Sequence, residues 1–528
     1  MTTNVLLVFP QFPHHSFWSF RSSISLLGAR AFAPPLGLLT VAALLPREWS
    51  VRLVNKNTDT LTDADLAWAD IVMTGGMLTQ RLDTLAVIDL CHAHDRLVVV
   101  GGPDATSCPD EYASADFLVL GEAEGVLSRF TDAWASGATS GVFEAPKFSI
   151  DVTTSPIPRF DLLTFNHYLC IGVQFSRGCP FTCEFCDIIE LYGRVPRAKS
   201  IEQMLGELDT LYRAGHRGHV DFVDDNFIGN KKALKLFLPA LIDWQQARRY
   251  PFRFSTEASI NLADDAELLR MMKRANFFVV FVGIESSNTD TLVSAQKRQN
   301  TRRDLVASVH TLYRAGLAVI AGFIVGFDTE QRPVADEMAD YITASSIAMC
   351  MAGLLTALPN TQLTRRLQRE GRLLPFDPAG GDQCSGGLNF TTLRPRREIL
   401  MDYRRLLAAI YEPAAYFGRV QVMDRLLNPS GPASRPSWRA WFRLGVAFLR
   451  FSGRVLREPA IGRYAWRVFA ECVWRRPGNL EAVMLFIGAY LHLGSFVRFL
   501  LEDLDRKIQK LEEDAHVDAT PIAHRAAG

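Results

Sequence analysis

The sequence lacks an excess of charge of either sign. Its 528 residues include 57 Lys and Arg against 57 Asp and Glu, so the formal net charge is zero. The composition therefore gives no sign of a basic surface, and we expect no nucleic-acid partner. Cysteine is also scarce: nine cysteines at irregular spacing in so long a chain do not indicate a disulfide framework.

The N-terminus lacks the features of a secretory signal. Residues 1–9 carry no positively charged segment before their apolar run, so they predict a first β-strand rather than a signal peptide. We therefore expect a cytoplasmic protein. The length predicts roughly three domains of about 100–200 residues each, and a hydrophobic content of 48% supplies their cores.

Residues 1–150 predict an α/β domain. Short runs rich in Val, Ile and Leu alternate with helix-like stretches, a pattern typical of a parallel sheet covered on both faces. The predicted strands are residues 5–10, 51–55, 71–76, 97–102 and 117–121. Several end in glycine, which lets a ligand approach the backbone at the carboxyl edge of the sheet. No G-x-G-x-x-G follows the first strand, which disfavours a dinucleotide and leaves a nucleotide or a corrin as candidates.

Three cysteines lie within eight residues of one another. Cys179, Cys183 and Cys186 form a C-x3-C-x2-C loop, and the only other cysteine nearby is Cys170, on the preceding predicted strand. A tetrahedral zinc site or an electron-transfer cluster normally takes four protein ligands. A cubane held by three thiolates leaves one iron open to an outside ligand. The alternatives are a zinc site or three buried thiols.

Residues 165–375 repeat a strand–helix unit. This pattern predicts a full or partial TIM-type barrel, whose chemistry sits at the carboxyl ends of the strands. Polar residues and glycines follow the predicted strands at Asp224, Asp225, Asn226, Glu257, Glu285, Ser286, Gly326 and Asp328. A single acidic residue in such a place is often a helix cap. Because these residues follow successive strands, we expect their carboxylates to lie together at the carboxyl end of the barrel, beside the cysteine loop.

The cysteine spacing resembles the signature of the radical S-adenosylmethionine (SAM) superfamily. The resemblance implies a [4Fe-4S] cluster on Cys179, Cys183 and Cys186, SAM bound at the open iron, and an electron donor such as flavodoxin or ferredoxin. It also implies cleavage of SAM to a radical that takes hydrogen from an unactivated carbon. The SAM-binding residues that it implies are Phe185, Asp224, Asp225, Asn226, Glu257, Glu285, Ser286, Gly322 and Gly326.

The N-terminal domain resembles the cobalamin-binding domain of one large class of these enzymes. The similarity rests on Pro34-Pro35-Leu36-Gly37 and on the glycine-containing turns after the predicted strands. The implied cobalamin-binding residues are Pro35, Gly37, Thr74, Gly75, Gly76, Gly101, Gly102, Gly121 and Glu122. The Asp-x-His-x-x-Gly motif that ligates cobalt in other cobalamin domains is missing from this region, so we expect no histidine ligand to cobalt. The alternative is an α/β domain that only packs against the barrel.

Three further segments indicate one particular branch of this superfamily. Residues 183–199, 224–230 and 256–259 resemble the cobalamin-dependent radical SAM branch that contains the hopanoid C-2 methylase. This resemblance implies methylation of a pentacyclic triterpenoid lipid at C-2, with methylcobalamin as the methyl donor and a second SAM to remethylate it. One alternative keeps both cofactors and acts on another lipid or a secondary metabolite, by methylation or cyclisation. Another is a non-catalytic Fe–S or corrinoid-binding protein. The sequence nominates no catalytic protein residue.

Residues 385–515 lose the strand–helix alternation and predict a helical domain. Residues 435–476 contain ten arginines against two glutamates, together with four tryptophans. This composition is typical of an interfacial membrane surface, with an ordinary helical cap as the alternative. Residues 482–500 are apolar but are interrupted by His492 and Arg498, which makes a poor spanning helix.

These observations predict four parts of the chain. They are a Rossmann-like cobalamin-binding domain (1–150), a partial TIM-type radical SAM barrel (160–380), a helical domain (385–515) and a disordered tail (518–528). We also expect peripheral contact with the inner face of the membrane through residues 435–476.

Overall fold

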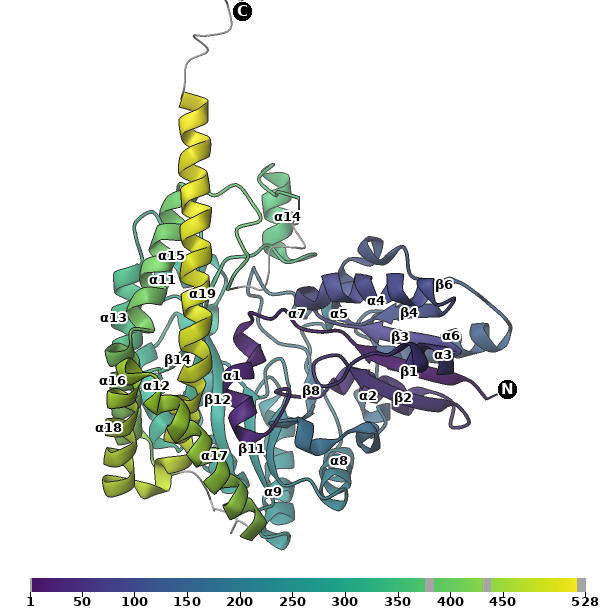
Figure 1. Cartoon of the computed structure of the whole chain (residues 1–528), viewed down its shortest axis with the longest axis horizontal. Coiled ribbons are helices and arrows are strands. Elements are labelled where there is room, and N and C mark those ends of the chain that lie inside the picture. Colours follow the sequence, from purple (N-terminus) through teal and green to yellow (C-terminus); the bar gives the residue numbers. More distant parts are fainter. Residues whose placement is uncertain (1, 376–383, 430, 432–437, 520–528) are drawn as a thin grey trace, which may run out of the picture.

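Two parallel sheets and a set of C-terminal helices make up the protein (Figure 1). The computed structural model describes residues 2–375, 384–429, 431 and 438–519. The architecture confirms the predicted α/β class, with a doubly covered N-terminal sheet, a partial barrel and a helical C-terminal region.

The N-terminal sheet is a twisted parallel sheet of six strands in the order β2-β1-β3-β4-β5-β6. The strands are β1 (Asn4–Phe9), β2 (Ser50–Asn55), β3 (Ile71–Gly75), β4 (Leu97–Gly101), β5 (Phe117–Leu120) and β6 (Gly141–Glu144). The helices are α2 (Leu36–Leu44), α3 (Asp63–Trp68), α4 (Arg81–Ala93), α5 (Pro103–Ser107) and α6 (Leu127–Ala135). Alternate residues of β1 are buried in two separate hydrophobic clusters, one on each face. The strand order reverses between β1 and β3, and ligands bind at the carboxyl ends of strands beside such a switch point.

The second sheet is an open barrel of six parallel strands in the order β14-β13-β12-β11-β10-β7. These are β7 (Ile171–Val173), β10 (Gly218–Phe222), β11 (Phe252–Glu257), β12 (Phe277–Glu285), β13 (Ala318–Val325) and β14 (Met349–Leu354). The longer helices of this region are α8 (Ile201–Arg213), α9 (Lys231–Ala247), α10 (Ala266–Ala275), α12 (Leu305–Arg314) and α13 (Ala335–Ser345). The shorter ones are α7 (Ile188–Leu191), α11 (Thr289–Ser294) and α14 (Gln362–Arg369). A small antiparallel ribbon, β8 (Ser176–Arg177) with β9 (Arg197–Ala198), brackets the cysteine loop.

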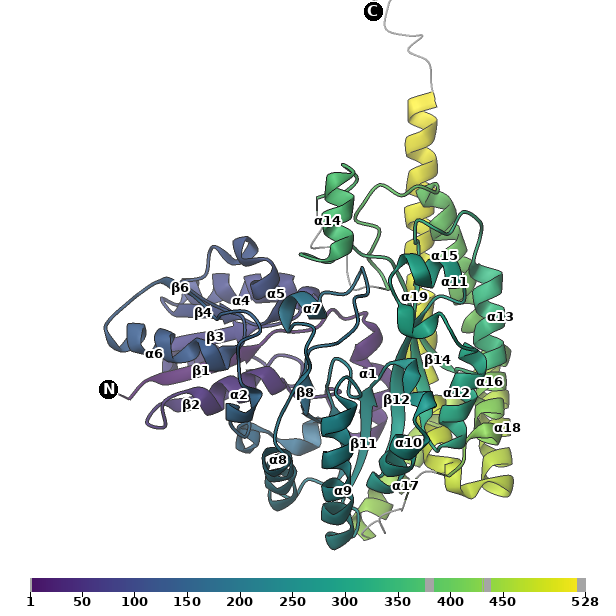
Figure 2. The same cartoon turned by 180° about the vertical axis from the view of Figure 1, so that it is seen from behind.

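The C-terminal helices close the open side of the barrel. They are α15 (Arg396–Ile410), α16 (Pro413–Leu426), α17 (Trp438–Leu456), α18 (Pro459–Arg475) and α19 (Leu480–Ala519). The long helix α19 packs against α15, α18 and the N-terminal helix α1 (Arg21–Ile24), as both views show (Figures 1 and 2). The Ser23 hydroxyl donates a hydrogen bond to the Gly488 carbonyl at 2.6 Å, and the His492 ring lies 3.1 Å from the Ser16 carbonyl. The beginning and the end of the chain therefore share one interface.

One helix in the described part of the chain has the length and composition of a membrane span. It covers Pro477–Asp514, and 61% of its apolar window is buried inside the protein, as in the core helix of a folded domain. The sequence interpretation of residues 482–500 as a poor spanning segment agrees with this burial. The predicted boundary at residues 380–385 falls largely on residues outside the described ones, as does most of the predicted tail. The domain boundaries therefore stay predictions.

Candidate functional site

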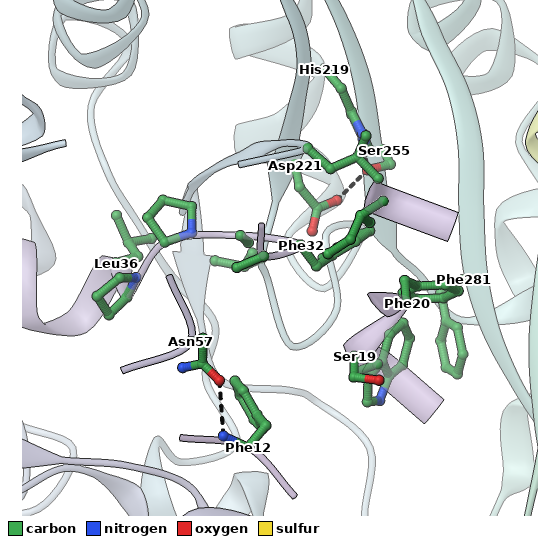
Figure 3. Close-up of a pocket in the computed structure, with 18 of the residues that line it drawn as sticks. Phe12, Ser19, Phe20, Phe32, Leu36, Asn57, His219, Asp221, Ser255 and Phe281 are labelled. Carbon is green, nitrogen blue, oxygen red and sulfur yellow. Dashed lines mark hydrogen bonds between the residues drawn. The ribbon is translucent and has the colours of Figure 1, made fainter. Parts of the chain in front are cut away.

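A single large cavity of about 1800 Å³ separates the two sheets (Figure 3). Its walls come from the carboxyl edge of the N-terminal sheet, the interior of the barrel, the segment 12–41 and the helices α17 and α19. The lining includes all nine residues that the sequence predicted for cobalamin: Pro35, Gly37, Thr74, Gly75, Gly76, Gly101, Gly102, Gly121 and Glu122. A typical small-molecule site has about 300–1,000 Å³, so this cavity has room for more than one ligand.

The wall of the cavity formed by the N-terminal sheet lets a ligand approach the backbone closely. A Cβ on Gly75 would lie 2.4 Å from the Gly101 carbonyl oxygen, so the strand ends meet there only because side chains are absent. A Cβ on Gly37 would meet no atom within 4 Å and would point into open space. The Thr74 hydroxyl is buried and has no hydrogen-bond partner among the described residues. A broad ligand with polar edges, such as a corrin, fits this wall.

Glu122 lines the cavity, but ion pairs engage both of its oxygens. Arg177 donates to Glu122 at 3.0 Å and to Glu124 at 2.7 Å, and Arg197 donates to the other Glu122 oxygen at 2.8 Å. The Arg177 side chain is 12% exposed and both glutamates are 5% exposed. Because Arg177 lies two residues before Cys179, we call this group the interdomain clamp: it joins the N-terminal sheet to the cysteine loop.

The cysteine loop is held by the end of β10. Asp224 accepts hydrogen bonds from the backbone amides of Phe175 and Ser176 at 2.9 and 2.5 Å and from the Ser176 hydroxyl at 2.6 Å. Asp225 accepts one from the Gly178 amide at 2.8 Å. Burial raises the pKa of Asp224 to about 7 and that of Asp225 to about 6. Both carboxylates therefore position the loop, and their predicted contacts with SAM stay predictions.

Two side-chain amides lie within hydrogen-bond distance of cysteine thiols in the loop. The Asn226 side chain donates to Cys179 Sγ at 3.8 Å, and the Gln299 side chain donates to Cys183 Sγ at 3.7 Å. Among the described residues, no three His, Cys, Asp or Glu side chains converge closely enough to hold one metal ion. A cubane binds each thiolate at a different iron, so its ligands need not converge on one point. Three thiols on one loop, with amides directed at the sulfurs, suit such a cluster.

The other predicted SAM residues follow neighbouring strands. Glu285 ends β12 and accepts a hydrogen bond from Lys297 at 2.6 Å, and both side chains are buried. Ser286 follows it and accepts from the Asn288 amide at 3.1 Å. The Phe185 ring packs near Phe327, with ring centroids 6.1 Å apart.

Two glycines let β13 pass close to these groups. A Cβ on Gly322 would lie 3.3 Å from the Phe281 ring and 3.8 Å from Glu285. Gly326 has a φ of +106° and donates its amide hydrogen to Glu330 at 2.8 Å. Glu285 and these glycines thus lie together on the neighbouring strands β12 and β13, and their joint role in binding SAM stays a prediction.

Glu257 is the one predicted SAM residue that also lines the cavity. Its Oε2 atom is buried and has no hydrogen-bond partner in the described part of the chain. Burial raises the pKa of Glu257 well above its usual value, and the nearby carboxylates of Asp221 and Asp224 add to the effect. A buried carboxyl group with an unpartnered oxygen at the carboxyl end of the barrel is available to form a hydrogen bond with a bound ligand.

Sequence reasoning missed part of the lining. His219, Asp221 and Ser255 face the cavity from β10 and β11 (Figure 3). The signal was present, because polar residues occupy alternate positions of both strands, which places them on one face. The aromatic residues of α17 and the apolar face of α19 also line the cavity. No local pattern in the sequence assigns them to it.

Three family descriptions match successive parts of the chain. Residues 25–131 match the B12 binding domain, residues 173–342 match the radical SAM superfamily, and residues 361–506 match a domain of unknown function, DUF4070. The cavity therefore lies where the first two regions face each other, closed by the third.

Two relatives match most of the length of this chain. The chain is 47% identical over 422 residues to an uncharacterised methyltransferase of Synechocystis sp., covering 78% of this chain and 77% of the relative. It is 38% identical over 510 residues to the hopanoid C-2 methylase of Rhodopseudomonas palustris, covering 94% and 93%.

Two solved structures have the same fold. One is the cobalamin-dependent SAM radical enzyme OxsB with aqua-cobalamin and SAM, with a TM-score of 0.60, 15% identity and coverage of 96% of this chain and 81% of that chain. The other is the radical SAM methyltransferase TsrM of Kitasatospora setae with cobalamin and a [4Fe-4S] cluster, with a TM-score of 0.59, 15% identity and coverage of 85% and 99%.

Proposed function

Because this chain belongs to the family of cobalamin-dependent radical SAM methyltransferases, we propose that it methylates a hopanoid, a pentacyclic triterpenoid, at C-2. Its cofactors are a [4Fe-4S] cluster, SAM and cobalamin. The hopanoid substrate rests on one observation: the 38% identity extends over 93% of the hopanoid C-2 methylase, including the helices that close the cavity.

Residues in different parts of the site would have different roles in the reaction. When bound, SAM on the cluster supplies a radical that abstracts hydrogen, and cobalamin supplies the methyl group. Cys179, Cys183 and Cys186 would hold the cluster, and the glycine-rich wall around Gly75 would hold the corrin. Asp224 and Asp225 fix the backbone of the cysteine loop, so the loop is organised before any ligand arrives.

The cavity suits a rigid lipid. Between the two cofactor walls its lining is mostly apolar, with Phe20, Phe32 and Phe281 from three separate elements (Figure 3). Helices α17 and α19 add Phe448, Met484 and further apolar residues and cover this part of the cavity. Such a lining keeps water away from a reactive carbon radical and buries apolar rings.

Lipid mass spectrometry tests the proposal. The gene is expressed in a hopanoid-producing host that lacks its own methylase, with the Cys183→Ala variant as control. A hopanoid heavier by one methyl group in the first strain, absent from the second, is the expected result. Unchanged hopanoids in a strain with loaded cluster and cobalamin would refute the substrate and leave the cofactor chemistry standing. A physiological donor such as flavodoxin or ferredoxin would supply the electron.

We also propose peripheral contact with an anionic membrane through α17 and α18. Leu449, Leu456 and Trp474 are 72%, 70% and 86% exposed, and an arginine follows each of them in the sequence. Phe448 and Phe451, on the same helix as Leu449, line the cavity, so α17 separates the exposed apolar surface from the cavity. Trp466 does not belong to this surface, because it is half-buried and packs against Phe448 and Phe469. The side chains of Trp438 and Trp441 lie outside the described residues.

Vesicle co-sedimentation tests the membrane contact. The holoenzyme should bind phosphatidylglycerol vesicles, and the Leu449→Ser/Trp474→Ser variant should bind them roughly tenfold or more weakly because it loses two exposed apolar side chains that the membrane would bury. Leu236→Ser, which changes an equally exposed leucine on the barrel helix α9, is the matched control. Equal binding of all three proteins would refute the contact.

A further inference from the structure

A polar strip interrupts the apolar interior of the barrel. It consists of His219, Asp221 and Ser255, which we call the polar triad (Figure 3). The Ser255 hydroxyl donates a hydrogen bond to Asp221 Oδ1, and His219 Nε2 lies 2.6 Å from Ser255 Oγ. Because the serine proton goes to Asp221, His219 Nε2–H is the donor to the serine oxygen. The three side chains thus form one fixed chain across β10 and β11.

Asp221 keeps one oxygen available. Its Oδ1 atom accepts from Ser255, while Oδ2 has no hydrogen-bond partner in the part of the chain that the structure describes. Figure 3 shows this second oxygen turned away from Ser255, toward the space between the two sheets. A carboxylate oxygen in such a position is a hydrogen-bond acceptor with its geometry already set, and leaving it without a donor costs free energy.

The surroundings of the polar triad restrict its partner. Val279, Phe281 and Ile320 form the neighbouring wall on β12 and β13, so the partner is a polar group on a largely apolar molecule. The Arg253 guanidinium lies on the same wall as the triad, on the strand of Ser255, and is paired with Glu481. Burying a further charged group among these apolar side chains is costly, which favours an uncharged donor, an alcohol hydroxyl.

We propose that the polar triad binds a hydroxyl group of the substrate through Asp221 Oδ2. This inference rests on the proposed function and specifies its substrate as a polycyclic alcohol. Asp221 pairs with Ser255 in the sheet register, two residues below Glu257. Two residues of strand span about 7 Å, so the hydroxyl would lie below the carboxyl edge of the barrel, where Glu257 and the other residues that would hold SAM lie. The substrate hydroxyl would therefore be on a different part of the molecule from the carbon that is methylated.

A paired-substrate assay on the reconstituted holoenzyme tests this. The two substrates are a hopanoid alcohol with its hydroxyl at the end of the molecule opposite C-2, and the hydrocarbon that lacks only this hydroxyl. Methylated products are quantified by mass spectrometry, and the ratio of the two kcat/KM values is the readout. The wild-type protein should prefer the alcohol by roughly 10- to 100-fold, the range for a hydrogen bond to a charged acceptor.

Two variants should abolish the preference. Ser255→Ala removes the serine hydroxyl that orients Asp221, and Asp221→Asn removes the charge. In both, the ratio should fall to within about threefold of unity, mainly because methylation of the alcohol slows while that of the hydrocarbon changes little. Ser308→Ala makes the same chemical change on the outer helix α12 and should keep the wild-type ratio. Iron and cobalamin contents confirm that each variant is folded and loaded.

The outcomes separate the two proposals. If the wild type methylates both substrates equally, or if Ser255→Ala slows both equally, the polar triad has a structural role only and the inference is wrong. If the wild type methylates neither while it still cleaves SAM, the hopanoid substrate is wrong and the inference fails with it. A high ratio that both triad variants lose establishes the hydroxyl site.

Discussion

Arg177 should control whether the N-terminal sheet and the barrel stay together. We consider Arg177→Met, which keeps much of the side-chain volume and removes the charge. The substitution deletes three hydrogen bonds, at 3.0, 3.1 and 2.7 Å, to the carboxylates of Glu122 and Glu124. Arg197 still pairs with Glu122. Ser155 remains a neutral donor to Glu124, but the buried charge of Glu124 loses its cation.

The expected free-energy cost of Arg177→Met follows from the burial of the carboxylates that it leaves without a cation. Removing one partner of a buried ion pair costs about 3–5 kcal/mol because a charge stays buried without compensation. Separation of the two domains returns the carboxylates to water, so this cost lowers the free energy of opening by the same amount. Since about 1.4 kcal/mol corresponds to a factor of ten, the open form becomes about two to three orders of magnitude more populated.

The cost of Arg177→Met to the closed arrangement of the two domains should rise with pH. In the wild type, burial alone would raise the pKa of Glu124, but the hydrogen bonds and charge of Arg177 lower it to about 2. That stabilisation is complete above the ordinary glutamate pKa of 4.5 and is lost as pH falls from 4.5 toward 2. In the variant, burial is opposed only by the neutral hydrogen bonds from Ser155 and the backbone, so we expect the folded-state pKa to lie above 4.5. The penalty is then full at high pH and disappears as pH falls to 4.5.

Hydrogen exchange measured by mass spectrometry checks this prediction. Peptides that cover residues 121–126 and 174–179 should exchange about 10²- to 10³-fold faster in Arg177→Met than in the wild type at pH 8. The ratio should shrink at pH 5. Arg159→Met, which removes a partly exposed pair with Asp161, should change exchange by less than about fivefold. A ratio near one at pH 8, or a ratio independent of pH, would refute the clamp.

Three further predictions concern the cofactors and their supports. Gly37→Phe should fill the cobalamin side of the cavity, so the purified protein loses bound cobalamin by absorbance while 5′-deoxyadenosine still forms; Gly418→Phe, at a helical glycine with equal free space, should retain it. Cys183→Ala should abolish both the charge-transfer absorption of the cluster and SAM cleavage, and survival of either would contradict the radical mechanism. Lys297→Met should lower the free energy of unfolding in urea by about 3–5 kcal/mol because it leaves Glu285 buried and unpaired. Adding Glu285→Gln should recover part of this loss.

The sequence predicted the elements with strong local signals. All five strands expected in residues 1–150 are present within one or two residues of their predicted bounds. β6 and β14 were not predicted. In β6 the exposed and half-buried residues alternate, and β14 contains methionines, a cysteine and a glycine rather than a branched aliphatic run. Both strands depend on their neighbours for pairing, and a single sequence carries no direct sign of such pairing.

In the candidate site, too, the sequence predicted features with a local signal and missed those that depend on contacts between distant residues. Glycines at strand ends identified one wall of the cavity, because close approach to the backbone requires residues without a side chain. The interdomain clamp joins residues 53 to 75 positions apart, and the serine and aspartate of the polar triad are 34 apart, so both exist only in three dimensions. The membrane surface stays a prediction, and Trp466 does not belong to it because its ring packs against Phe469.

The shared interface of the chain ends sets the order of events during synthesis. Ser16 and Ser23 find their partners His492 and Gly488 more than 460 residues later in the chain. At about 5–20 residues per second, the ribosome needs roughly 25–90 s to make the intervening segment. For that time the wall formed by α19 does not exist, and the side of the cavity that this helix covers is open to solvent. A ligand can therefore enter the space between the two sheets on the nascent protein, before the last helix closes it.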